Sequence, residues 1–322
     1  MWKGLFLSCF IYITLSPAFA TDYQSHIDSV LHATYNACGK INQELKILKT
    51  MAGINTAVTA TGTVSSGIAL GTGIKKASID VKAEKIEAEL QNEIQKLNQL
   101  AITQTHIDIL PEFEPDNSDK NINTAQKSIN DKQTELDELT KKSKTLGNIR
   151  TGTLAGTAVT DIAGTIIATQ NKIDDDLQSK INECVSSVNN LSNAYMQLRI
   201  SEPQNPQLPY IQNIIRECEP WATVDLSKIN KNANNSAVSS GIGAAMSIAG
   251  TITSASANSD QIRNNNSQSG KSKEKKLNTA SNVMAGGAAA ASGIATIFNA
   301  TQISTIKQAM QIAEKCEQAM NK

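Results

Sequence analysis

The residue types that carry out catalysis or bind metals are sparse in this sequence, and their spacing does not group them. The three histidines are His26, His32 and His106. His26 and His32 lie six positions apart, which places them on different faces of a helix and does not suit a shared metal ion. We therefore predict exposed or half-buried histidines, no metal site and no cofactor.

Other catalytic patterns are incomplete. The segment SGKS, residues 269–272, shares its ending with a phosphate-binding loop, but that loop needs an earlier glycine where this chain has Asn265. No GxSxG segment places a serine for nucleophilic attack. Asp174, Asp175 and Asp176 are expected on a solvated helix face. Because no acid, base and nucleophile are grouped, the sequence predicts no enzyme and no small-molecule substrate.

The cysteines are more informative. Cys9 lies in residues 1–20, which have one lysine, an apolar run and small residues at the end, the plan of a secretory signal peptide cleaved after Ala20. The apolar run is too short for a membrane span, which takes roughly 20 residues. The mature chain is then extracytoplasmic, periplasmic or secreted, where cysteines form disulfides. Its four cysteines are Cys38, Cys184, Cys218 and Cys316.

Long helices must position these cysteines. Prolines and aromatic residues are few, and apolar residues recur at intervals of three and four, which predicts an all-α fold. We predict one helical hairpin over residues 21–200 and a shorter one over 236–322, joined by a linker with a short helix at 201–235. In the first hairpin, the charged residues 76–146 are predicted to form a coiled-coil tip around a proline-rich loop at 107–119.

The positions of the cysteines fit two such hairpins. Antiparallel helices bring together residues that are equally far from the point where the chain folds back. For Cys38 and Cys184 that point is Pro111, and for Cys218 and Cys316 it is residue 267; both lie in predicted loops. We therefore predict the disulfides Cys38–Cys184 and Cys218–Cys316.

Runs of Gly, Ala, Ser and Thr occupy the arms of both hairpins. The word VSSGI occurs in the first run and again in the third, at 64–68 and 238–242, and we interpret the hairpins as an internal duplication. Reflection about Pro111 carries the first run onto the second, and reflection about residue 267 carries the third nearly onto the fourth. The runs are residues 53–75, 147–169, 236–257 and 279–300.

Small residues spaced by four predict close approach of helix backbones. Glycine costs about 1 kcal/mol relative to alanine in a helix interior, so close packing must offset that cost. The candidate packing positions are Gly67, Gly71, Gly152, Gly156, Gly241, Ala245, Ala249, Ala285, Ala289 and Gly293.

Such helices pack in water as a bundle and also in a bilayer. The runs are rich in Ser and Thr, and the second contains Arg150 and Asp161. A charge at the centre of a spanning helix costs about 2.5–3.5 kcal/mol, so the sequence favours a water-soluble bundle. The run at 279–300 comes nearest to a spanning segment. Balanced charge gives no field that would attract nucleic acid.

Two functions remain open. The first is a secreted or periplasmic, non-enzymatic structural or interaction protein, which presents the tip, residues 76–146, to a protein partner or associates with itself. The alternative is a membrane-active protein, a pore former or translocator, which inserts its small-residue hairpins. An apolar outer face on the four runs would distinguish the second function from the first.

Overall fold

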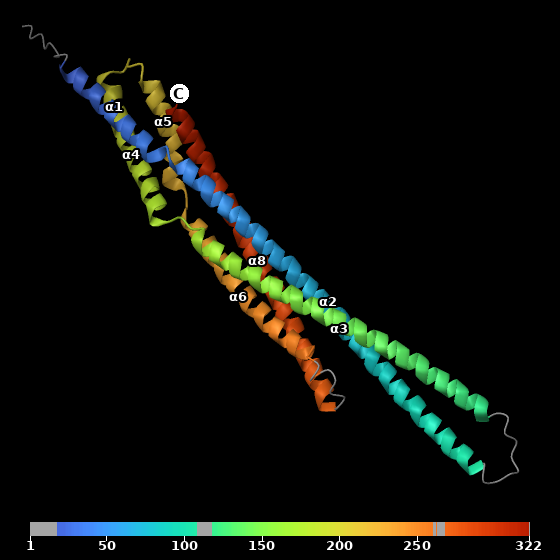
Figure 1. The fold of residues 1–322 in the computed structure, drawn as a ribbon. Helices are drawn as coiled ribbons and strands as arrows, with labels where there is room; N and C mark the ends of the chain where they lie inside the picture. The colour runs from blue at the N-terminus through green and yellow to red at the C-terminus, as the bar shows by residue number, and fades with distance from the viewer. Residues whose placement is uncertain (1–17, 108–117, 260–261, 263–267, 322) are drawn as a thin grey trace, which may run out of the picture. The chain divides into compact units, whose positions relative to one another are not determined.

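A computed structural model describes residues 18–107, 118–259, 262 and 268–321. The described residues form helices and no strand, which confirms the all-α prediction (Figure 1). Most of the predicted signal peptide and both fold-back points, Pro111 and residue 267, lie outside the described residues. The helices are α1 (Ala18–Cys38), α2 (Ile41–Ile107), α3 (Ser118–Gln170), α4 (Asp175–Ser201), α5 (Leu208–Cys218), the 3-10 helix η1 (Glu219–Thr223), α6 (Ser227–Ala257) and α8 (Gln268–Met320).

Two helix breaks interrupt stretches that the apolar spacing predicts to be continuous. The first is a turn between α1 and α2, where the backbone N–H of Gly39 donates to the carbonyl of Tyr35 at 2.9 Å. The second precedes α4. There the Asp174 carboxylate caps the helix by accepting from the backbone N–H of Leu177 at 2.8 Å. The acidic cluster is therefore a helix start, where negative charge interacts favourably with the helix dipole.

The described chain divides into two compact units. Each unit takes a part of both predicted hairpins, so the division differs from the predicted domain boundaries at 21–200 and 236–322, which follow chain order. Unit 1 comprises the described parts of Met1–Met51, Asn171–Lys231 and Thr301–Lys322, and unit 2 comprises those of Ala52–Gln170 and Asn232–Ala300.

Unit 1 has an apolar core of the usual kind. Its buried side chains come from α1, α4, α5, η1 and the adjoining parts of α2, α6 and α8. Trp221 is 3% exposed, and the Tyr210 hydroxyl donates to the backbone carbonyl of Met320 at 2.8 Å, so Tyr210 lies where α8 ends. The large buried aliphatic residues are Ile27, Ile41, Leu45, Leu48, Ile173, Leu177, Ile181, Val188, Leu191, Leu198, Leu208, Ile211, Ile214, Leu226, Ile229 and Ile306.

Both predicted disulfides are present, and both lie in unit 1. Cys38–Cys184 joins α1 to α4 across a sequence separation of 146, and Cys218–Cys316 joins α5 to α8 across 98. The sulfur atoms of Cys38, Cys184 and Cys316 lie within 4.8 Å of one another and are buried. Metal binding needs free thiolates, so these bonded sulfurs are covalent links between helices. Two disulfides are typical of proteins from an oxidising compartment.

In unit 2, parts of α2, α3, α6 and α8 pack as a bundle of two antiparallel hairpins (Figure 1). The register agrees closely with the sequence symmetry. The Ser66 hydroxyl lies 3.4 Å from that of Thr157, the neighbour of the predicted partner Gly156. In the second hairpin Gly287 lies against Met246, the neighbour of the predicted Ser247. The cysteine spacing therefore predicts the alignment of helices far from the cysteines themselves.

Candidate functional site

Unit 2 contains a section with no exposed charge, which we call the central section. It consists of residues 52–74 on α2, 147–170 on α3, 232–259 on and just after α6, and 277–300 on α8. Its only charged residues are Arg150 and Asp161, and both are fully buried. Each of the four stretches is longer than the roughly 20 residues that a helix needs to cross a hydrocarbon core.

The outer surface of the central section is apolar on all four helices. Every helix turns β-branched aliphatic side chains outward, among glycine, alanine and some threonine, and the amide side chains of Asn148, Gln170 and Asn234 are exposed near the ends of the section. The exposed aliphatic residues are Ile54, Val64, Ile68, Ile74, Ile149, Val159, Ile162, Ile166, Val238, Ile242, Ile248, Ile252, Val283, Ile294 and Ile297. An apolar outer face on all four runs is the feature that the alternative function, a membrane-active protein, predicts.

The interior of the central section combines polar side chains with alanine. Among the described residues there, Leu154 is the only large aliphatic side chain that is buried; it packs with Ala69 and Ala285. The buried polar residues are Asn55, Thr59, Ser66, Arg150, Thr157, Asp161, Ser236, Ser240, Ser247, Ser254, Asn278, Ser281, Ser292 and Asn299. This section therefore buries small and polar side chains and exposes most of its isoleucines and valines, whereas unit 1 buries its large aliphatic side chains.

Asp161 lies near the middle of the central section, where all four helices meet. The Ser292 hydroxyl of α8 lies 2.8 and 2.9 Å from the two carboxyl oxygens of Asp161 and 2.9 Å from the carbonyl of Ala288. On α2 and α6, Gly62 and Gly243 give the carboxyl group room: a Cβ atom would lie 2.7 Å from Oδ1 at Gly62 and 2.5 Å from Oδ2 at Gly243. Three helices thus accommodate one polar side chain of the fourth.

Arg150 forms a second polar layer, nearer the tip. Its guanidinium group donates to the Ser254 hydroxyl at 3.1 Å, to Asn282 Oδ1 at 2.9 Å and to Asn278 Oδ1 at 3.1 Å. All three acceptors are neutral. A Cβ atom at Gly73 on α2 would overlap Asn282, so the absence of a side chain at Gly73 leaves room for the Asn282 amide that binds Arg150. The guanidinium is hydrogen-bonded inside the bundle and is shielded from the surroundings of the outer surface.

A third polar layer joins α2, α6 and α8 at the opposite end of the central section. Asn55 Nδ2 donates to Asn299 Oδ1 at 2.9 Å, and Asn299 Nδ2 donates to the Thr59 hydroxyl at 3.2 Å. Gly164 of α3 faces this layer, with its ideal Cβ position 3.0 Å from Thr59 and 3.3 Å from Ser240. Hydrogen-bonded polar layers inside a bundle with an apolar exterior are the arrangement that a hydrocarbon environment favours.

The predicted packing residues differ in burial: some lie inside the bundle and others on its surface. Ala285 is buried against Leu154, as close packing requires. Ala245 is exposed, and Gly241, Ala249, Ala289 and Gly293 are half-buried. Gly67, Gly71, Gly152 and Gly156 lie on exposed faces with no atom within 4 Å of an added Cβ, which corrects the packing role within this chain that their spacing predicts. The glycines that admit neighbouring side chains are instead Gly62, Gly73, Gly147, Gly164, Gly243, Gly250 and Gly287.

Alanine substitution separates these two kinds of glycine. Gly243→Ala and Gly67→Ala both gain the helix preference of alanine, but only the first places a methyl group against the hydrogen-bonded Asp161. We expect Gly243→Ala to be less stable than Gly67→Ala by about 1–3 kcal/mol, the usual cost of overpacking. Thermal and urea unfolding followed by far-UV circular dichroism measures the difference. Equal stability of the two variants would contradict the packing at Asp161.

Beyond the central section, α2 and α3 continue as the charged pair of the tip, residues 76–107 and 118–146 (Figure 1). Lys132 Nζ donates to a Glu89 carboxylate oxygen at 2.7 Å. This hydrogen bond lowers the pKa of Glu89 and raises the pKa of Lys132. Ile86 and Leu90 are buried on the same part of α2. The tip is therefore a helical pair with an apolar seam and a charged outer surface.

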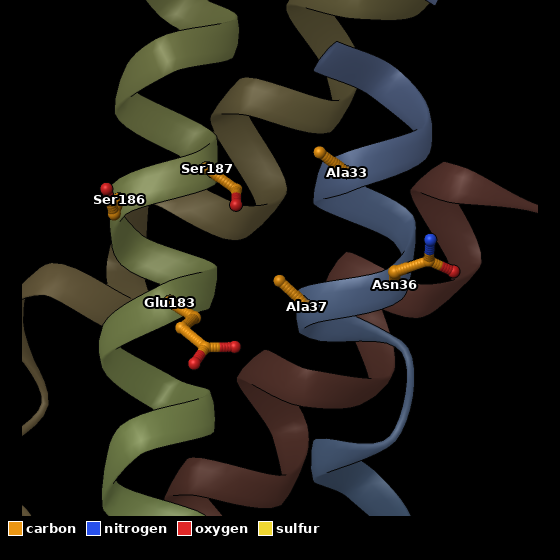
Figure 2. A pocket seen from close by; sticks show the side chains of 6 residues that line it. All are labelled: Ala33, Asn36, Ala37, Glu183, Ser186 and Ser187. Atoms are coloured by element: carbon orange, nitrogen blue, oxygen red, sulfur yellow. The ribbon is translucent and has the colours of Figure 1, made fainter. Parts of the chain in front are cut away.

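A shallow groove of unit 1 lies between α1 and α4 (Figure 2). Ala33, Asn36 and Ala37 line it from α1, and Glu183 lines it from α4 with two serines. A single carboxylate with an amide and hydroxyl groups does not pair a nucleophile with a base. His32 contacts Asn36 beside it at 3.0 Å and has no carboxylate partner within the described residues. No catalytic step follows from this groove.

Comparison with protein-family models, curated proteins and solved structures finds no significant match for this chain. By length and hydropathy, one described helix, Ser269–Met320, qualifies as a candidate membrane span, with a mean hydropathy of 1.4 over its most apolar window. That criterion averages the two faces of a helix, so the buried Ser, Asn and Thr side chains lower the values of the other three helices. Which side chains of each helix point outward is thus more informative about a membrane environment than the mean hydropathy of the helix.

Proposed function

We propose that this chain is a non-enzymatic envelope protein whose central section is embedded in a lipid bilayer and whose charged tip is presented to a partner. The observation that carries the proposal is the inverted polarity of the central section. Isoleucine and valine face outward, while hydroxyl, amide and charged groups face inward and are mostly hydrogen-bonded. In hydrocarbon, polar groups need partners inside the bundle, and small residues let the helices approach.

The same arrangement is unfavourable in water. Full burial of an isoleucine or valine contributes about 1.5–3 kcal/mol, and the central section leaves such residues exposed on every helix. It also buries hydroxyl and amide groups, whose desolvation costs free energy unless they are hydrogen-bonded. Unit 1 of the same chain follows the ordinary pattern, with an apolar core. The inversion is therefore specific to the central section and does not follow from the composition of the chain as a whole.

A bilayer around the central section also has a topological consequence. Helix α2 is continuous from Ile41 to Ile107, so hydrocarbon around residues 52–74 separates the two ends of that helix. Disulfides form in oxidising compartments, which supports an extracytoplasmic location for the end next to Cys38. The tip is then available on the other face, to a protein partner or to another copy of the chain.

Vesicle flotation with an alkaline carbonate wash tests the proposal. The full mature chain is mixed with phosphatidylcholine vesicles, floated through a density gradient and then extracted at high pH. We expect the protein to float and to resist extraction, since an embedded bundle is held by its apolar surface and needs no charged lipid. A chain that stays at the bottom of the gradient would overturn the proposal, whether it is a monomer or an oligomer that covers its own apolar faces.

A pore is a second candidate, favoured by the polar layers around Asn55, Asp161 and Arg150 inside the central section. The buried hydroxyls of Ser240 and Ser247 have no hydrogen-bond partner within the described residues, as expected for groups that meet water. The layer of Leu154, Ala69 and Ala285 is apolar and closes the interior between Asp161 and Arg150. Release of an entrapped dye by the reconstituted chain would favour a pore, and retention of the dye would exclude one of that size.

A further inference from the structure

Lysines gather where the central section ends and the tip begins. Lys75 directly follows the exposed Ile74 on α2, and Lys141 and Lys142 lie on the facing part of α3. We call the exposed lysines at this level the basic rim. They are Lys75 and Lys82 on α2, Lys141, Lys142 and Lys144 on α3, and Lys273, Lys275 and Lys276 on α8.

Ion pairs fix α8 at the same level as α2. Lys76 is 1% exposed and lies 3.2 Å from a carboxylate oxygen of Glu274 on α8. Further along, Lys271 of α8 lies 2.5 Å from Glu87 of α2. The α8 lysines on either side of Glu274 therefore surround the bundle together with those of α2 and α3. Three helices contribute cations to one edge of the apolar surface.

The acidic side chains near the basic rim are largely engaged by other residues. Asp80 pairs with Lys76 at 2.8 Å and accepts from the Ser143 hydroxyl at 2.5 Å. Glu138 lies 3.4 Å from Lys142. Within the described residues, Lys75 and Lys141 make no ion pair, so their ammonium groups are available to an anion from outside.

A groove runs between α2 and α3 at this level. Its volume is about 510 Å³, and three lysines line it together with Ile79 and Leu146, Thr145 and the carboxylate of Glu138, which pairs with Lys142; the lysines are Lys75, Lys141 and Lys142. Ile79 and Leu146 are half-buried, whereas the three lysines are exposed. The groove therefore combines ammonium groups with an apolar floor, immediately beside the surface that we propose to be covered by hydrocarbon.

We propose that this groove binds the headgroup of an anionic phospholipid. The phosphate lies between Lys75 and Lys141, and the upper part of an acyl chain contacts Ile79 and Leu146. The inference rests on the proposed function, since the bilayer brings the lipid to this edge. An ammonium group is a compact point charge that suits a phosphate, and each lysine near an anionic lipid surface strengthens binding roughly fivefold. A soluble phosphate compound would leave the apolar floor uncovered.

Lipid retention tests the site. The full mature chain in mild detergent is titrated with phosphatidylglycerol and, separately, with phosphatidylcholine of identical acyl chains, and bound lipid is counted by native mass spectrometry. We expect the wild-type chain to prefer phosphatidylglycerol. The double variant Lys75→Gln/Lys141→Gln should bind phosphatidylglycerol on the order of 20-fold more weakly, with phosphatidylcholine binding unchanged.

The matched control is Lys120→Gln/Lys127→Gln. Both control lysines are exposed on α3. They lie about 21 Å or more along the helix from Lys141, far beyond a Debye length of about 8 Å, so this variant should keep the wild-type preference. Equal retention of the two lipids by the wild-type chain would overturn the lipid site, and so would an undiminished preference in the double variant. Because flotation uses phosphatidylcholine alone, a chain that floats yet shows no preference loses the lipid site but keeps the proposed function.

Discussion

Val64→Arg is expected to remove most of the association of the chain with a bilayer. Val64 is 63% exposed on α2, two residues from Gly62 and therefore near the middle of the central section. Arginine at the centre of a spanning helix costs about 2.5–3.5 kcal/mol, which lowers partitioning by roughly 70- to 400-fold. On a helix surrounded by water, the same exposed substitution changes stability by only about 0.5 kcal/mol. The effect of Val64→Arg thus shows whether hydrocarbon or water surrounds this face of α2.

Flotation with phosphatidylcholine vesicles measures this effect, and far-UV circular dichroism shows whether the variant keeps its helices. Ile200→Arg is the matched control, since Ile200 is 83% exposed but lies on α4 of unit 1. We expect the control to float like the wild-type chain. If Val64→Arg and Ile200→Arg float equally well, lipid does not cover the outer face of α2.

Removal of the disulfide Cys38–Cys184 should have the largest effect on the stability of unit 1. The bond joins residues separated by 146 positions, and loss of a native disulfide costs about 2–5 kcal/mol. In the chain-entropy account, a longer closed loop constrains the unfolded chain more, so Cys38→Ser/Cys184→Ser should destabilise at least as much as Cys218→Ser/Cys316→Ser, whose separation is 98.

Urea unfolding followed by tryptophan fluorescence measures the loss. Trp221 is the only tryptophan outside the predicted signal peptide, and it is buried in unit 1. Its signal therefore reports the unit that holds both disulfides. A stability change below about 1 kcal/mol in the Cys38→Ser/Cys184→Ser chain would contradict the view that this bond holds α1 against α4.

The sequence predicts the helical hairpins, the disulfide pairing and the helix register because all three follow from distances along the chain. Once Cys38 pairs with Cys184 and the loop surrounds Pro111, each residue of one arm has an assigned partner on the other. Ser66 meets Thr157, one position from its assigned partner, although a helix break interrupts each arm between these residues and the cysteines. The break before α4 could have been found from Asp174, whose type and position are typical of an N-cap.

The direction in which each residue faces is harder to predict. The helical period shows which residues share one face of a helix, but it does not show whether that face points into the bundle or outward. Gly67 and Gly71 have the spacing of packing glycines but face outward, whereas Gly62 and Gly243 face Asp161. Asp161 and Arg150, taken singly, argue against a bilayer. In the folded bundle both are buried among polar partners, and the apolar residues of the same runs lie outside. The polar residues in the sequence of a single run therefore do not predict which side chains lie inside the four-helix bundle and which lie outside it.

Depth-dependent quenching tests the central claim most directly. A fluorophore is attached through Val64→Cys, which is selective because the cysteines of the described chain are buried in disulfides. The labelled mature chain is reconstituted into vesicles that contain lipids with a quencher at mid-chain, or is exposed to aqueous iodide. Strong quenching by the mid-chain lipid and weak quenching by iodide is the predicted result. Strong quenching by iodide with none from the lipid would contradict a central section that lies in hydrocarbon.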